Sequence, residues 1–97
     1  MNDISNEELH EATIRELAVV LGEDVAALKK RIEEADGDLE IKSTQGQAVA
    51  SRIEVRVLDV EDLIRPEDQK TENLTTISSL ERLIRTRIKE RRAKEEK

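Results

Sequence analysis

The chain has no cysteine and no aromatic residue, and each absence excludes a class of protein. Without cysteine no disulfide can staple the fold, and with His10 as the only histidine a zinc site of His and Cys ligands is not expected. Phe, Trp and Tyr supply much of the buried area in most cores, so Leu, Ile, Val and Ala must form this core alone. The 97 residues are enough for one domain.

Apolar residues are also scarce. They make up 36% of the chain, whereas charged residues make up 41%, against about 25% in an average globular protein. A chain of this length buries only about 60–65% of the surface that its unfolded form exposes. We therefore expect its aliphatic side chains to need a second polypeptide, either another copy in a homo-oligomer or the subunits of a larger complex.

The sequence has no hydrophobic run of the roughly 18 residues that cross a bilayer. Its first residues are acidic and lack the apolar segment of a signal peptide. The absence of cysteine fits a reducing compartment. We expect a cytoplasmic protein without a membrane partner.

Charge is distributed unevenly along the chain. Residues 1–38 contain eleven acidic and four basic residues, whereas residues 72–97 contain five acidic and eight basic residues. The net charge of −6 therefore combines an acidic first segment with a basic last segment. Such a division indicates an electrostatic partner or association between the opposite ends of two copies.

Residues 6–35 carry a clear helical pattern. Ser5 followed by Glu8 has the form of a capping box, and Gly37 suits the left-handed end of a helix. Gly22 falls inside the pattern, so the segment is either one helix or two helices joined there; because the heptad phase continues through Gly22, we favour one helix. The apolar positions recur at alternating spacings of four and three: Ile14, Ala18, Leu21, Val25, Leu28, Ile32 and Ala35.

Residues 39–58 predict a small two-stranded β-hairpin. Apolar and polar residues alternate from Leu39 to Lys42 and again from Arg52 to Val57, which is typical of half-buried strands. The residues between them are small and polar, as in a mobile hairpin loop. Because an isolated hairpin is not stable in water, we expect it to pack on a helix or to pair with another copy.

Residues 59–73 are expected to form a flexible connector, since Pro66 interrupts them and residues 66–73 lack apolar side chains. Residues 74–97 predict an amphipathic helix with a basic tail. Together these elements predict one small domain that is mostly α or α+β, in which residues 1–38 form the acidic helical segment.

The two apolar stripes and the basic tail predict the function. We expect a coiled-coil-type interaction or assembly subunit, which in its general make-up resembles viral scaffolding, connector or chaperone components. The expected protein interface consists of Ile14, Ala18, Leu21, Val25, Leu28, Ile32, Ile77, Leu80, Ile84 and Ile88. The expected electrostatic tail consists of Arg82, Arg85, Arg87, Lys89, Arg91 and Arg92.

No enzyme, cofactor or small-molecule substrate is expected from the sequence. His10 is expected at the surface of a helix, and the serines lack a nucleophile motif. The acidic residues between positions 61 and 68 lack the spacing and the central glycine of a calcium loop. The three glycines stand far apart, which excludes a phosphate-binding loop.

Residues 13–32 suggest an alternative function. A helix containing Arg-Glu-Leu-Ala, then Leu21 and Gly22, then a second helix resembles the core of a helix-turn-helix, and the expected hairpin would follow it as in the winged version. The resemblance implies a nucleic-acid-binding regulator that uses Lys29, Lys30 and Arg31 together with the basic tail. The acidic charge of this segment favours protein partners instead, because neutralising phosphates supplies most DNA affinity.

Overall fold

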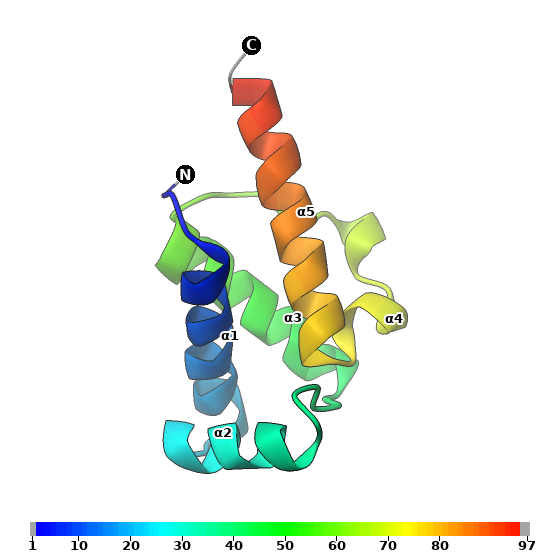
Figure 1. Ribbon diagram of the computed structural model, residues 1–97. Coiled ribbons are helices and arrows are strands. Elements are labelled where there is room, and N and C mark those ends of the chain that lie inside the picture. The colour runs from blue at the N-terminus through cyan, green and yellow to red at the C-terminus, as the bar shows by residue number, and fades with distance from the viewer. Residues whose placement is uncertain (1, 96–97) are drawn as a thin grey trace.

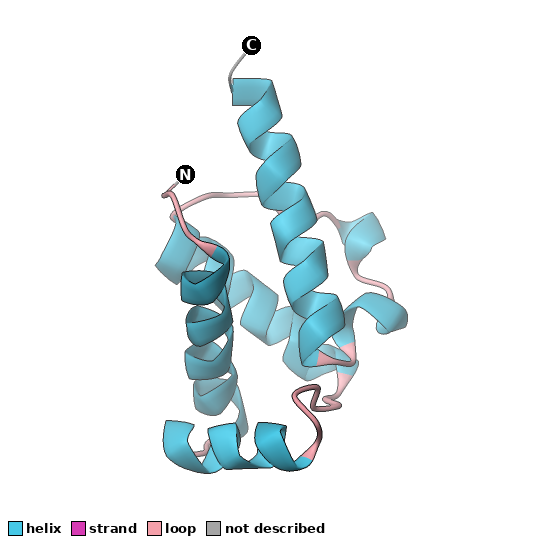
Figure 2. Ribbon diagram, viewed as in Figure 1, coloured by secondary structure: helices cyan, strands magenta, loops and turns pink. Residues whose placement is uncertain are grey.

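The structure, a computed structural model, describes residues 2–95 and folds them into five α-helices and two short helical segments (Figure 1). Figure 2 shows helices and loops over these residues, and the two-stranded β-hairpin predicted for residues 39–58 is absent from them. The α-helices are α1 (Asn6–Leu21), α2 (Val25–Glu34), α3 (Ser43–Arg52), α4 (Thr71–Leu74) and α5 (Ile77–Glu95). The short segments are a π-helix, η1 (Ile53–Leu58), and a 3₁₀-helix, η2 (Pro66–Asp68).

A turn at Gly22 separates α1 from α2, so the prediction of one helix continuing through this residue is wrong. The predicted capping box starts α1: the Ser5 hydroxyl accepts from the Glu8 amide and the Glu8 carboxylate accepts from the Ser5 amide, each at 3.1 Å. Gly22 adopts a left-handed φ of 68°, which costs glycine little. The chain then turns, and α2 crosses the end of α1 and buries Leu28 and Ile32 (Figure 1).

Residues 43–58 are helical where the predicted hairpin had its loop and second strand. The alternation of residues 52–57 is typical of a strand. The preceding residues carry a helical stripe, but two of its members are small, so a pattern of large apolar residues does not reveal the stripe. The buried positions follow the spacing of a helix face: Gly46, Val49, Ala50 and Ile53. At the predicted first strand, Glu40 forms a single isolated bridge with Thr76.

Residues 59–73 are more closely held than the predicted flexible connector. Leu63 and Ile64 are buried, and η2 places the side chain of Asp68 in the interior. Within the described residues, the predicted C-terminal helix is confirmed as α5, although it begins at Ile77. Thr76 starts it by accepting from the Ser79 amide at 3.2 Å.

The core lies where α1, α3 and α5 meet. α1 packs on α3 and α5, and α3 also contacts α4 and α5. In Figure 1, α5 projects beyond the other helices at its C-terminal end, and the N-terminal segment runs beside its second half. The largest fully buried side chains are aliphatic apart from one threonine: Leu9, Thr13, Leu17, Leu28, Val49, Ile53, Leu58, Leu74, Ile77, Leu80 and Ile84.

Candidate protein-binding groove

The structure places eight of the ten predicted interface residues in the core of the single chain. Leu21 and Val25 are only partly buried, on either side of the turn at Gly22. A partner therefore reaches little of either stripe in the folded chain. The eight buried residues are Ile14, Ala18, Leu28, Ile32, Ile77, Leu80, Ile84 and Ile88.

The predicted electrostatic tail divides between two faces of α5. The first face carries residues at spacings of three and four, which share one side of a helix: Arg82, Arg85, Lys89 and Arg92. Arg87 and Arg91 project from the other flank. Arg85, Lys89 and Arg92 line a groove, whereas Arg82 and Arg87 border a hollow beside the connector.

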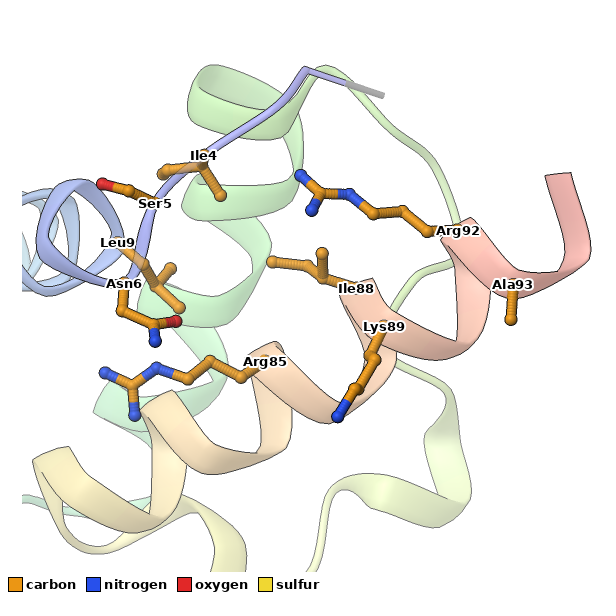
Figure 3. A pocket seen from close by; sticks show the side chains of 9 residues that line it. All are labelled: Ile4, Ser5, Asn6, Leu9, Arg85, Ile88, Lys89, Arg92 and Ala93. Atoms are coloured by element: carbon orange, nitrogen blue, oxygen red, sulfur yellow. The ribbon is translucent and has the colours of Figure 1, made fainter. Parts of the chain in front are cut away.

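The groove lies between the N-terminal segment and the second half of α5 and has a volume of about 560 Å³. Figure 3 shows Ile4 and Leu9 opposite Ile88, so the floor is aliphatic. Ile4 precedes the N-cap of α1 and Leu9 lies in its first turns, which is the arrangement of a hydrophobic staple. The remaining lining residues are Ser5, Asn6, Arg85, Lys89, Arg92 and Ala93.

Three basic side chains border this floor, and partners within the chain neutralise them unequally. Arg92 lies 2.7 Å from the carboxylate of Asp3. Arg85 lies 3.2 Å from Glu81 through one terminal nitrogen, while its Nε is buried and finds no hydrogen-bond partner in residues 2–95. Over the same residues Lys89 is exposed and joins no ion pair. The groove therefore presents positive charge beside an aliphatic floor.

Glu81 connects the two walls of the groove. Its side chain is buried, and Oε1 lies 2.7 Å from Nδ1 of His10 in α1 while Oε2 contacts Arg85. A buried carboxylate is stable only when it is paired, so these contacts hold α1, α5 and the Arg85 guanidinium in fixed positions. The predicted surface residue His10 thus has a defined partner on another helix.

The groove suits a ligand that is both acidic and aliphatic. A guanidinium group binds a carboxylate through two parallel hydrogen bonds, and an ammonium group adds a point charge. Arg85, Lys89 and Arg92 span two turns of α5, or about 10 Å. That length accommodates a short peptide segment whose apolar side chains contact the floor.

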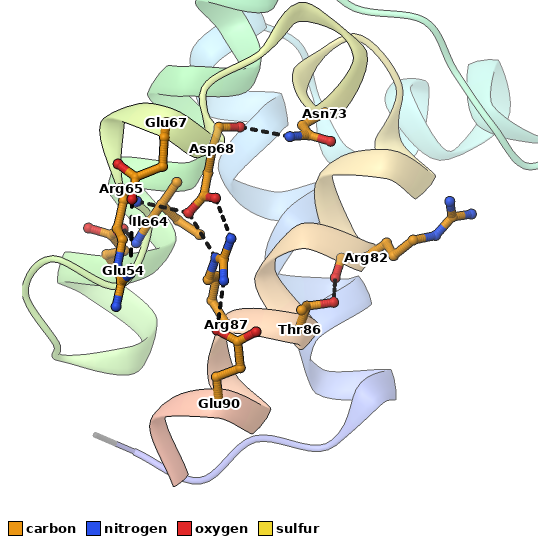
Figure 4. Close-up of polar contacts among 10 residues, drawn as sticks. All are labelled: Glu54, Ile64, Arg65, Glu67, Asp68, Asn73, Arg82, Thr86, Arg87 and Glu90. Carbon is orange, nitrogen blue, oxygen red and sulfur yellow. Dashed lines mark hydrogen bonds and ion pairs between the residues drawn. The ribbon is translucent and has the colours of Figure 1, made fainter. Parts of the chain in front are cut away.

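The other flank of α5 holds the connector in place (Figure 4). Nε of Arg87 lies 2.8 Å from Asp68, a second nitrogen of the same guanidinium bonds to the other carboxylate oxygen, and a third lies 2.6 Å from Glu90. Arg87 holds the pKa of Asp68 below its usual value, and the two carboxylates raise the pKa of Arg87. Arg87 is therefore occupied within the chain.

The remaining acidic residues do not converge. Within residues 2–95, no group of three His, Asp or Glu side chains is placed to hold a metal ion. Of the acidic residues between positions 61 and 68, Asp68 turns inward to Arg87 and the others are exposed. In the same part of the chain, no helix combines the length and the apolar character that crossing a membrane requires.

The heptad pattern predicts the α5 side of the groove but not its N-terminal wall. Ile4 and Leu9 lie outside the stripe that begins at Ile14, so the periodicity does not point to them. The available signal was local: two apolar residues flank the capping box formed by Ser5 and Glu8. Nothing in the sequence brings that staple to α5.

No known protein guides the assignment of function. Comparisons with protein-family models, with curated proteins and with solved structures give no match.

Proposed function

We propose that the chain is a protein-interaction module, an adaptor or assembly subunit that binds an acidic, aliphatic segment of a partner protein in the groove between α1 and α5. The observation that carries the proposal is the aliphatic floor of Ile4, Leu9 and Ile88 beside Arg85 and Lys89. Apolar contacts supply affinity, and the basic edge selects and orients an acidic partner.

The size of the groove limits the strength of the interaction. A single short segment buries much less than the roughly 1,200 Å² of a stable protein complex, so we expect an affinity in the micromolar range. The walls are already fixed by the staple and by the contacts of Glu81, so little ordering accompanies binding.

A protein segment fits this groove better than a nucleic acid does. Nucleic acids need many phosphate contacts, and single strands also need aromatic side chains for stacking. The chain has no aromatic residue, and Arg92 is already paired with Asp3. An aliphatic floor instead matches Leu, Ile or Val side chains of a partner.

The proposal is tested with a fluorescent model peptide of Glu, Leu and Ala in heptad order, and with the same peptide carrying Lys in place of Glu. We expect Lys89→Glu to weaken binding of the acidic peptide about tenfold, because it replaces attraction by repulsion at the groove edge. Fluorescence anisotropy at low and high salt measures the effect.

Lys94→Glu is the matched control. It makes the same charge change on the same helix, but Lys94 lines the other flank. Binding that falls equally in both variants, or that does not prefer the acidic peptide over the basic one, contradicts the proposal.

We propose nucleic-acid binding through α1 and α2 as the second candidate, because the break at Gly22 produces two helices joined by a short turn. Two basic residues of α2 are occupied: Lys29 lies 3.1 Å from Glu11, and Arg31 pairs with Glu23. A salt-dependent gel shift of duplex DNA that Lys30→Glu abolishes would favour this candidate over the first.

A further inference from the structure

A cluster of three arginines around one buried carboxylate lies beside α1. The side chain of Glu16 is only 5% exposed. Nε of Arg52 lies 2.9 Å and Nε of Arg56 lies 3.4 Å from one of its oxygens, and Nε of Arg15 lies 3.6 Å from the other. One negative charge therefore faces three positive charges.

The geometry leaves the outer ends of these arginines available. Each of them approaches Glu16 through Nε, and within residues 2–95 no further acceptor contacts their terminal nitrogens. The side chains of Arg15 and Arg56 are 59% and 62% exposed. Because the buried carboxylate holds the inner edge of each guanidinium, the outer edges are oriented in advance for a second carboxylate.

Three acidic residues on the preceding turns of α1, Glu7, Glu8 and Glu11, line a hollow that Arg15 also borders. Glu8 accepts the Ser5 amide in the capping box, and Glu11 lies 3.1 Å from Lys29. Glu8 and Glu11 therefore have partners of their own, and over the described residues Glu16 is the carboxylate that pairs with the guanidinium groups of Arg15, Arg52 and Arg56.

Exposed valines flank the arginines. Val19 and Val55 are the large hydrophobic residues that stand out as exposed over the described part of the chain, at 56% and 68%. Val19 follows Arg15 by one helical turn, and Val55 lies next to Arg56 in η1. The surface thus combines positive charge with aliphatic contact, as the groove does.

This surface and the groove lie on different sides of α1. Arg15 follows Asn6, which lines the groove, by nine residues, and nine residues are about two and a half turns of a helix. The same interval separates Val19 from His10, which faces α5. Two segments can therefore be bound at once.

We propose that Arg15, Arg52, Arg56, Val19 and Val55 form a second docking surface for an acidic, aliphatic segment of a partner protein, so that the chain bridges two such segments. Charge complementarity identifies the occupant: three guanidinium groups share the one carboxylate of Glu16 and favour a partner's carboxylates, and the exposed valines favour aliphatic neighbours. The inference rests on the proposed function only for the class of partner, since the two surfaces share no residue.

The experiment titrates the acidic model peptide into the full chain by calorimetry. We expect wild type to bind two peptides per chain. We expect the double variant Arg15→Gln and Arg56→Gln to bind peptide in the groove as wild type does. Its affinity for peptide at the second site should fall at least about tenfold. Arg52 remains in this variant, so Glu16 keeps its closest partner and thermal melting should be unchanged. Arg65→Gln with Lys70→Gln removes the same charge from the exposed connector and is the control.

Further variants separate failure of this inference from failure of the proposed function. The Lys89→Glu variant should still bind one peptide at the arginine surface. That binding should shift the NMR signal of the Arg52 Nε–H. Val19→Ser with Val55→Ser should weaken that site without changing charge. The inference is overturned if wild type binds one peptide and the arginine variant is unaffected. It is equally overturned if inorganic phosphate or duplex DNA, and not the peptide, shifts the Arg52 signal.

Discussion

Asp68 illustrates at the scale of a residue how a charge in an apparently polar loop supports the fold. Its carboxylate is buried and joined to Arg87 through both oxygens, and it also accepts from the Arg65 amide at 3.1 Å. Because its folded pKa lies below the usual value of 3.8, the pair contributes stability that is present above that pH. This contribution is lost as the pH falls through the lower, folded pKa.

We therefore predict that Asp68→Asn lowers the free energy of unfolding by about 1–3 kcal/mol at neutral pH, because the half-buried Arg87 loses its two-oxygen carboxylate partner and keeps only Glu90. The variant should also lose less stability than wild type on acidification. Urea unfolding at neutral and at acid pH measures both effects. Glu67→Gln, an exposed neighbour 3.9 Å from Arg65, should change little. Equal losses of unfolding free energy in Asp68→Asn and Glu67→Gln would contradict the prediction.

At the scale of elements, the close approach of α3 to α4 depends on Gly46. A Cβ at this position would lie 2.9 Å from Cβ of Leu74 and would overlap the Leu74 backbone. Helix propensity alone predicts that Gly46→Ala stabilises a helix by about 1 kcal/mol. We predict the opposite sign, a loss of about 1–3 kcal/mol, since α4 must move away. Chemical denaturation measures it, with exposed Gln47→Ala as control; a stabilised Gly46→Ala variant would refute the close packing.

Helices with large apolar residues and clear caps could be predicted from the sequence, and those with small residues could not. Ser5, Glu8 and the stripe of α5 carry local signals that do not depend on the rest of the chain. α3 has Gly and Ala at buried positions, so its pattern is understood only once Leu74 lies against Gly46. The heptad that continues through Gly22 is compatible with two folds, and tertiary packing of Leu28 decides between them.

The candidate groove, too, could be predicted only in part from the sequence. Arg85, Lys89 and Arg92 could be placed on one face of a helix from their spacing alone. The pairing of Arg87 with Asp68 could not be predicted, because Asp68 lies nineteen residues before Arg87 in the chain. The apolar wall contributed by the N-terminal segment depends equally on contacts between the two ends of the chain.

At the scale of the whole molecule, the few apolar residues are gathered into one core. Leu, Ile, Val and Ala from all five α-helices form one continuous buried cluster within a single chain. Most of the stripe positions are thereby used inside the chain.

We accordingly predict that the melting temperature of wild type does not change over a hundredfold dilution, since a folding equilibrium coupled to association would be concentration-dependent. Leu28→Asp should unfold the chain at every concentration, because it places a charge in the core. Val25→Asp, at a partly exposed position on the same stripe, should be tolerated better. Differential scanning calorimetry with sedimentation analysis measures these effects. A melting temperature that falls on dilution would show instead that the stripes are completed by a second copy.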